Sequence, residues 1–230
     1  MNKRGYISLL GGGTKLIGDS AAMLAARDAV LDSGAFAALS DTVASAARGS
    51  RILDAGAGTG HYLRSVLTAL PDARGLALDL SPAAAARAIR SSERIDGVVA
   101  DTWRPLPVRT AVADTVLDVF APRNLPEFHR VLRPSGTLLV VVPRPDHLAE
   151  LRVAGAMLNI PGDKADEVVA AATDLFALDT REHVRATLEL DDRLRHALVA
   201  MGPSAHHASQ TAPAVASATL SIDLVRLTAR

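Results

Sequence analysis

Residues Ile52 to Gly60 read I-L-D-A-G-A-G-T-G, and this stretch decides the fold of the chain. It is a short apolar strand that runs into a turn with glycine at every second position, Gly56, Gly58 and Gly60. Because glycine has no Cβ, the backbone can adopt positive φ angles and approach a bound ligand closely. We expect a helix to begin near His61, with its free N–H groups facing whatever lies on the loop. The stretch therefore predicts a ligand at a strand–helix junction.

Two classes of ligand suit such a loop, and the residue spacing separates them. The dinucleotide fingerprint is G-x-G-x-x-G, which places a pyrophosphate at the helix N-terminus. Here the pattern is D-x-G-x-G-x-G, and the carboxylate of Asp54 would repel a pyrophosphate but suits an amino group or a sulfonium. Asp79 closes the next strand nineteen residues after Gly60, a position typical of an acid that holds a ribose diol. The pattern resembles motif I of the class I S-adenosylmethionine (SAM) methyltransferases; the alternative is a tight turn in another α/β protein.

Composition limits the classes of protein that remain. The 230 residues suffice for a sizeable α/β domain, and 49% of them are hydrophobic but only 3% aromatic. No apolar run approaches the roughly 20 residues that span a bilayer, and the N-terminus lacks a signal-peptide core, so we expect a cytoplasmic protein without membrane contact. The absence of cysteine excludes disulfides and thiolate zinc sites, and no metal is expected. A net charge of zero gives no general attraction to nucleic acid.

Strand and helix patterns alternate from Arg51 to Val142, which predicts a doubly wound, mostly parallel sheet of the Rossmann-like kind. Two alternating segments near the C-terminus are expected to pair as an antiparallel edge, giving seven strands. The N-terminal arm and its helices (1–47) are expected to precede a methyltransferase domain (48–230). Strands are predicted at 51–54, 75–80, 97–100, 115–120, 137–142, 184–190 and 218–227, and helices at 19–32, up to 47, 61–70, 82–92, 126–132, 147–159 and 163–176.

Polar side chains follow the C-terminal ends of the predicted parallel strands, which share one edge of the sheet and form the ligand site of such folds. Asp101 occupies the position that meets adenine in class I methyltransferases; an ordinary turn acid is the alternative. Trp103 is either a stacking face or a core anchor. Asp146 and His147 follow the fifth strand, and position makes His147 the best functional candidate among seven histidines. The residues expected to bind the cofactor are Asp54, Gly56, Gly58, Gly60, His61, Asp79, Leu80, Asp101, Thr102, Phe120 and Ala121.

Several segments, in order along nearly the whole chain, resemble one family: the large-subunit ribosomal RNA guanine-N1-methyltransferases (the RlmA/TlrB family), in the branch that gives resistance to tylosin-type macrolides. This resemblance is more specific than motif I, which many unrelated methyltransferases share. The segments are G-Y-I-S-L-L (5–10), G-D-S-A-A-M-L-A-A-R (18–27), L-D-S-G (31–34), L-D-A-G-A-G-T-G-H-Y (53–62), V-F-A-P-R-N (119–124), L-R-P-S-G-T-L-L-V-V (132–141), D-H-L-A-E-L (146–151) and A-M-G-P-S (200–204).

The resemblance implies methyl transfer from SAM to N1 of a guanine in a 23S rRNA hairpin, from which the base must first be unstacked. N1 of neutral guanine carries a proton that a group on the enzyme must accept, and the candidates are Asn124, Asp146 and His147. Arg123, Arg27 and Trp103 are expected to bind the substrate.

One feature of the family is missing from the sequence. The family normally opens with a four-cysteine zinc module that helps to recognise RNA, and this chain has no cysteine. Two alternatives therefore stay open: methylation of a small molecule or another RNA, and SAM binding without catalysis. The resemblance also makes a homodimer a candidate assembly.

Overall fold

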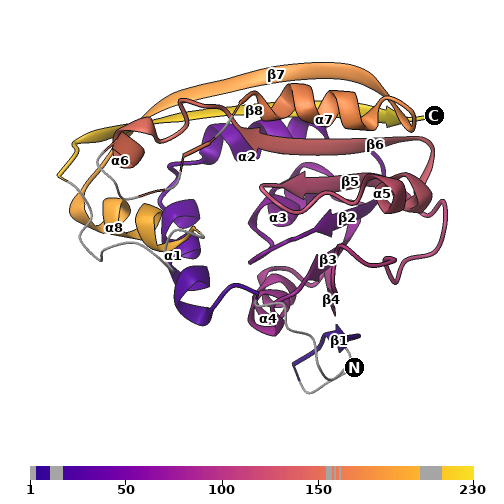
Figure 1. Ribbon diagram of the computed structural model, residues 1–230. Coiled ribbons are helices and arrows are strands. Elements are labelled where there is room, and N and C mark those ends of the chain that lie inside the picture. The colour runs from indigo at the N-terminus through magenta and orange to yellow at the C-terminus, as the bar shows by residue number, and fades with distance from the viewer. Residues whose placement is uncertain (1–3, 11–17, 154–156, 158, 161, 203–213) are drawn as a thin grey trace.

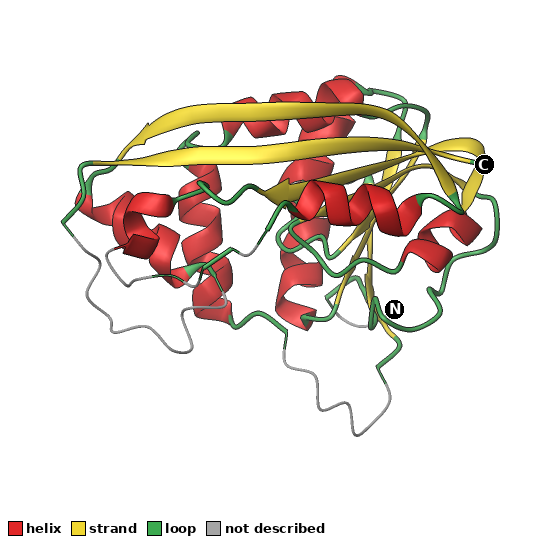
Figure 2. Ribbon diagram, turned by 45° about the horizontal axis from the view of Figure 1, so that its top comes forward, coloured by secondary structure: helices red, strands yellow, loops and turns green. Residues whose placement is uncertain are grey.

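A mixed sheet with helices on both faces organises the protein (Figures 1 and 2). The computed structural model describes residues 4–10, 18–153, 157, 159–160, 162–202 and 214–230. Within them, eight strands lie in the order β1-β4-β3-β2-β5-β6-β8-β7. The first six strands of this order are parallel, and β8 pairs antiparallel with both β6 and β7. The elements are β1 (Ile7–Ser8), α1 (Ala21–Asp32), α2 (Ala37–Ala46), β2 (Arg51–Ala55), α3 (His61–Ala69), β3 (Arg74–Asp79), α4 (Pro82–Ser91), β4 (Ile95–Val99), β5 (Ala113–Val119), α5 (Leu125–Val131), β6 (Leu132–Pro143), α6 (Ala149–Val153), α7 (Lys164–Ala172), β7 (Phe176–Glu189), α8 (Asp192–Ala200) and β8 (Ser217–Ala229).

Local sequence signals account for the helix starts. The Ser20 hydroxyl accepts a hydrogen bond from the Met23 N–H at 3.2 Å, which caps α1. At α4, Ser81 is the N-cap and Pro82 the first helical residue, where a missing N–H costs nothing. The seven predicted strands and the doubly wound topology are confirmed, with the two-residue β1 as an additional edge strand.

Two hydrophobic cores lie on opposite faces of the sheet. One packs α1, α2 and α3 against residues such as Ile52 and Leu117, and the other packs α5 and α7 against Val116 and Val140. The helices α1 and α2 thus share a core with the sheet, and the glycine-rich segment starts from strand β2 of that sheet. No helix in the described parts of the chain is long and apolar enough to cross a membrane.

The C-terminal third differs from the sequence prediction. The helix predicted over 163–176 ends at Ala172, and β7 begins at Phe176 instead of Val184. β7 is an edge strand whose residues 177–183 are exposed, and its register with β8 shifts between Leu178 and Thr180, so the strand lacks the alternating pattern used to find it. Helix α8 was not predicted, although Asp191 caps it by accepting from the Leu194 N–H. Figure 1 shows β7 and β8 running together as long strands toward α6 and α8.

The segment after β6 also differs. A helix was predicted from His147, but α6 begins at Ala149 and His147 precedes it. Leu148 has a φ of +51°, which no helical residue adopts, so the chain turns before α6 begins. The end of that predicted helix, near 154–158, lies largely outside the described residues.

Candidate active site

The glycine-rich loop joins β2 to α3 in a conformation that favours glycine. Gly56, Gly58 and Gly60 have φ angles of +85°, +54° and +79°. The N–H groups of Gly56 and of the next residue donate to the Leu78 carbonyl at 2.7 and 3.1 Å, which fixes the loop to the end of β3. Left-handed conformations cost non-glycine residues roughly 1–2 kcal/mol each, so the alternating glycines follow from the backbone path.

The loop is also approached closely by its surroundings. A Cβ on Gly56 would lie 2.5 Å from the Cβ of Ala121, and one on Gly60 would lie 2.9 Å from the Cβ of Ala88. A Cβ on Gly58 would lie 3.2 Å from Nη1 of Arg27. The glycines thus leave room for close packing against the loop by the segment after β5, by α1 and by α4.

Asp54 and Asp79 lie at the adjacent C-terminal ends of β2 and β3. Asp79 accepts from the Gly58 N–H at 2.8 Å and, through its other oxygen, from the Ser81 N–H at 2.7 Å. Burial raises the pKa of Asp79 despite these two bonds. Burial and the neighbouring Asp79 raise the pKa of Asp54 from 3.8 to about 8. Two carboxyls that resist ionisation in this position are suited to a ligand that brings positive charge.

The end of β5 meets the end of β6 through two aromatic rings. Phe120, which has a φ of +53°, stacks on His147 with 6.1 Å between ring centroids and 17° between planes. Phe36 contacts the His147 ring edge-on, with 6.3 Å between the ring centroids. Nδ1 of His147 accepts from the Ser221 N–H at 3.3 Å, and burial lowers the pKa of the ring from 6.5 to about 4. The imidazole is therefore neutral at pH 7, with its proton on Nε2.

Asn124 joins the segments that follow β4 and β5. Its Nδ2 donates to the carbonyls of Thr102 at 2.9 Å and Arg104 at 3.3 Å. Asp101 accepts from the Trp103 N–H at 2.9 Å, and the Trp103 side chain is an exposed hydrophobic surface at 62% accessibility. The structure thus excludes the core-anchor alternative for Trp103 and leaves it free to stack on a ligand.

His61 and Leu80 occupy less central positions. His61 begins α3, but its Nε2 lies 3.0 Å from the hydroxyl of Ser40 on α2, so the ring is directed at that helix. Burial lowers the pKa of His61. Leu80 follows β3 directly and is half-buried.

Asp118 is a buried acid that the sequence prediction missed. Neither of its carboxylate oxygens has a hydrogen-bond partner within the described residues. Burial, assisted by the charge of Asp54, raises its pKa to about 8, and the nearby Arg123 acts in the opposite sense. Since Asp54 pairs with Leu117 across β2 and β5, Asp118 points to the other face of the sheet. An acid inside the apolar run V-L-D-V-F was the available signal.

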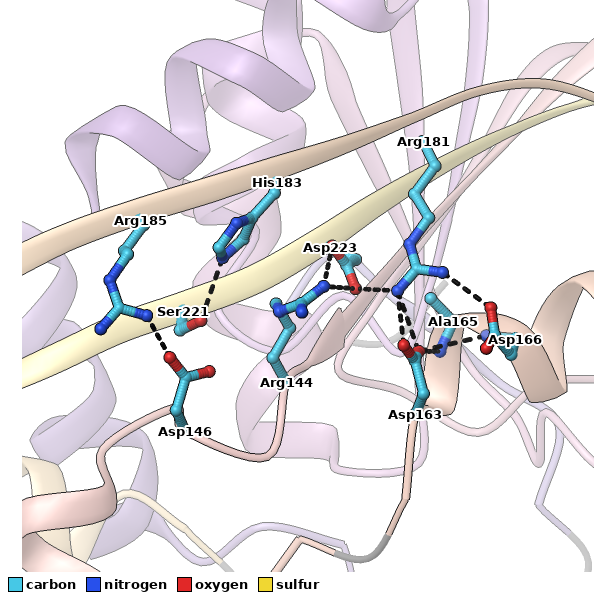
Figure 3. Close-up of polar contacts among 10 residues, drawn as sticks. All are labelled: Arg144, Asp146, Asp163, Ala165, Asp166, Arg181, His183, Arg185, Ser221 and Asp223. Atoms are coloured by element: carbon cyan, nitrogen blue, oxygen red, sulfur yellow. Dashed lines mark hydrogen bonds and ion pairs between the residues drawn. The ribbon is translucent and has the colours of Figure 1, made fainter.

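Asp146 makes an ion pair of its own beside a larger ion-pair network on the outer strands (Figure 3). It pairs with Arg185 of β7, and although burial acts to raise its pKa, hydrogen bonds from Ser221 and Arg185 lower it overall. Nearby, Arg144 and Arg181 both bind the buried Asp223, at 3.0 and 2.8 Å.

The network extends from these strands to α7. Arg181 also binds Asp163 and Asp166 at the start of that helix, at 2.8 and 2.7 Å. Because Arg144 directly follows β6, the network ties the start of the segment that carries His147 to β7, β8 and α7.

The site fits SAM. This cofactor combines an adenosine ribose diol with three charged groups on its methionine part: an ammonium, a carboxylate and a sulfonium. Asp54 precedes the glycine-rich loop as a buried acid, and Asp79 lies beside the loop with lone pairs left unused by its two backbone bonds. These features come from two segments, residues 54–60 and the end of β3, which the pairing of β2 with β3 brings together.

Comparison with known proteins agrees with this geometry. Residues 52–136 match the family model described as "Methyltransferase domain". The 23S rRNA (guanine(748)-N(1))-methyltransferase of Streptomyces fradiae is 44% identical over 212 residues, which cover 89% of this chain and 76% of that protein. A Micromonospora griseorubida protein named for 23S rRNA guanine-N1 methylation is 40% identical over 224 residues with the same coverage.

Solved structures establish the fold. A chain from the Haloferax volcanii complex of the Trm112 methyltransferase activator with a methyltransferase has a TM-score of 0.59 at 20% identity, covering 89% of this chain and 93% of that one. A SAM-dependent methyltransferase of Thermotoga maritima has a TM-score of 0.55 at 14% identity, covering 88% and 92%. The fold is that of the class I SAM-dependent methyltransferases, and the sequence relatives show that the chain belongs to the 23S rRNA (guanine-N1)-methyltransferase family.

Proposed function

We propose that this protein methylates N1 of a guanine in 23S rRNA, with SAM as the methyl donor. The observation that supports this most strongly is the 44% identity to the Streptomyces fradiae enzyme over 89% of the chain. The match extends over 212 residues, far beyond residues 52–136 that the methyltransferase family model matches. Protection against tylosin-type macrolides is the corresponding biological role.

Each acid of the site has its own role in binding SAM. Asp79 accepts the ribose hydroxyls, because each of its oxygens has a lone pair left after the Gly58 and Ser81 bonds. Asp54 faces the ammonium and sulfonium, whose positive charge relieves the unfavourable ionisation of this buried carboxyl. Asp101 and Thr102 receive the adenine at the end of β4, and Phe120 and Ala121 complete the wall beside Gly56.

SAM supplies an electrophilic methyl group on its sulfonium, and the protein must orient guanine N1 toward it and remove the N1 proton. The three candidates for that proton differ in their surroundings. Asp146 is paired with Arg185, and both N–H groups of the Asn124 amide hold carbonyls of the 102–104 loop. His147 is neutral, with Nε2–H as a donor.

We therefore assign His147 a role in polarising the guanine O6. A hydrogen bond from Nε2 to O6 would stabilise the deprotonated base, in which negative charge is shared between N1 and O6, while the N1 proton passes to solvent water. Arg123 and the exposed Trp103 are assigned to the RNA, by phosphate pairing and base stacking respectively.

Primer extension tests the substrate. 23S rRNA is incubated with the protein and SAM and then reverse-transcribed. A methyl group on N1 blocks Watson–Crick pairing and stops the reverse transcriptase at one guanine. We expect one such stop, absent without SAM and absent with His147→Ala if the ring polarises O6. Ribosomal RNA that acquires no stop, together with methylation of a small-molecule acceptor, would contradict the rRNA assignment.

Calorimetry with SAM tests the cofactor site separately. Asp79→Ala removes the ribose acceptor, and we expect SAM affinity to fall by about tenfold or more, as for loss of hydrogen bonds to a charged group. Asp96→Ala is the matched control, since its carboxylate makes only an exposed pair with Arg74 at 3.5 Å. Unchanged affinity for SAM in Asp79→Ala would refute the ribose assignment whatever the RNA experiment shows.

A further inference from the structure

Arg27 of α1 places its guanidinium directly on the glycine-rich loop. Its Nη1 lies 3.2 Å from the position of a Cβ on Gly58, and within the described structure only Arg27 supplies atoms within 4 Å of that position. The Arg27 side chain therefore borders the part of the loop that the cofactor must approach.

The guanidinium is held from two sides but keeps donors to spare. Nη1 pairs with Asp19, and Nη2 donates to the Met201 carbonyl at the end of α8 at 3.1 Å. Arginine has five N–H donors, so these two contacts leave several N–H groups unused. The side chain is 28% exposed, which leaves those donors accessible to a ligand.

Three acids also lie near the loop. Asp19, Asp54 and Asp79 surround it, and burial raises the pKa of both Asp79 and Tyr62, while Arg27 acts to lower each of them. An anionic ligand group that approaches the loop at Gly58 meets the guanidinium of Arg27 there. The methionine part of SAM carries such a group, its α-carboxylate, and a planar guanidinium pairs with a carboxylate through two parallel hydrogen bonds.

We propose that Arg27 binds the α-carboxylate of SAM and so directs the methionine end of the cofactor toward α1 and α8. This assignment replaces the RNA contact expected for Arg27 from the sequence. It depends on SAM as the ligand of the loop and not on the identity of the methyl acceptor. Failure of the rRNA experiment therefore leaves it untouched.

The test measures the affinities of SAM and of decarboxylated SAM, which lacks only the carboxylate, by calorimetry. The wild-type protein should bind decarboxylated SAM about tenfold to a hundredfold more weakly than SAM, as for loss of a charged hydrogen-bonded pair. In Arg27→Met, SAM affinity should fall to the level of decarboxylated SAM, whose own affinity should stay within about twofold of wild type. Arg27→Lys, which keeps the charge but not the fork, should lie between them.

Arg87→Met is the matched control. Arg87 of α4 pairs with Asp28 of α1 at 2.8 Å and donates to the Ala21 carbonyl of α1 at 3.2 Å. Like Arg27, it therefore holds α1 in place through one ion pair and one bond to a carbonyl. We expect it to leave both affinities unchanged. Equal losses for the two ligands in Arg27→Met would show that Arg27 only positions α1, and no loss for SAM would also overturn the proposal. If Arg27→Met does not unfold cooperatively on heating, Arg27→Gln replaces it in the same comparison.

Discussion

SAM binding should release a proton from Asp54, and this can be measured. In the structure burial and Asp79 raise the pKa of Asp54 to about 8, so the carboxyl is largely protonated at pH 6. When the positive methionine end of SAM lies beside it, the charged form is favoured and the pKa falls toward its ordinary value of 3.8. Binding and ionisation are thereby linked, and SAM affinity should rise with pH.

The size of the effect follows from one proton. Between the bound and the free pKa, each pH unit changes the binding free energy by up to about 1.4 kcal/mol, which is tenfold in affinity. The useful window is pH 5.5 to 7, because α-amino groups such as that of SAM titrate near 8. Over this range the dissociation constant should fall by up to about thirtyfold.

Calorimetry gives two independent readouts. The dissociation constant is measured at several pH values, and at pH 7 in two buffers with different ionisation enthalpies, whose difference reports the protons released. We expect close to one proton per SAM in the wild type and none from this position in Asp54→Asn, which should also lose the pH dependence. Asp96→Asn is the control, since its carboxylate makes only an exposed pair with Arg74 at 3.5 Å in the described structure. An Asp54→Asn variant with the wild-type pH profile would refute the reasoning.

Three further predictions concern stability and the loop. The folded pKa of about 8 at Asp118 lies above its ordinary 3.8, so this group's contribution to stability is present below pH 4 and is lost as the pH rises to 8. In urea unfolding, the stability of Asp118→Asn relative to wild type should therefore increase by up to about 1.4 kcal/mol per pH unit between pH 5 and 7. A difference in stability that stays constant with pH would contradict this. Gly56→Ala should cost roughly 1–2 kcal/mol in backbone strain and at least about tenfold in SAM affinity, whereas Gly34→Ala, with a φ of +80° and open space around it, should cost the strain alone in thermal unfolding and calorimetry. Arg181→Met removes one of two guanidiniums from Asp223, which is 1% exposed, and should lower the free energy of unfolding by about 1–3 kcal/mol; a smaller loss would show that the remaining arginine suffices.

The sequence predicted most of the parallel sheet because its signals are local. Apolar runs, the Ser81–Pro82 helix start and the alternating glycines each identify an element without knowledge of its neighbours. The prediction was wrong in the C-terminal third, where β7 is an exposed edge strand with a register shift and α6 starts two residues after His147. There the outcome depends on pairing with β8 and on the Asp223 ion pairs, which have no local signature.

The same distinction applies to the site. The sequence by itself determined the backbone path of the loop, the acid at the end of β2 and the spacing to Asp79, because all three are local properties of one stretch of chain. Only the tertiary structure placed Arg27 on Gly58, stacked Phe120 on His147 and buried Asp118 with no hydrogen-bond partner among the described residues. These contacts join residues distant in sequence, and burial sets the pKa of each buried acid only once the surrounding side chains are in place.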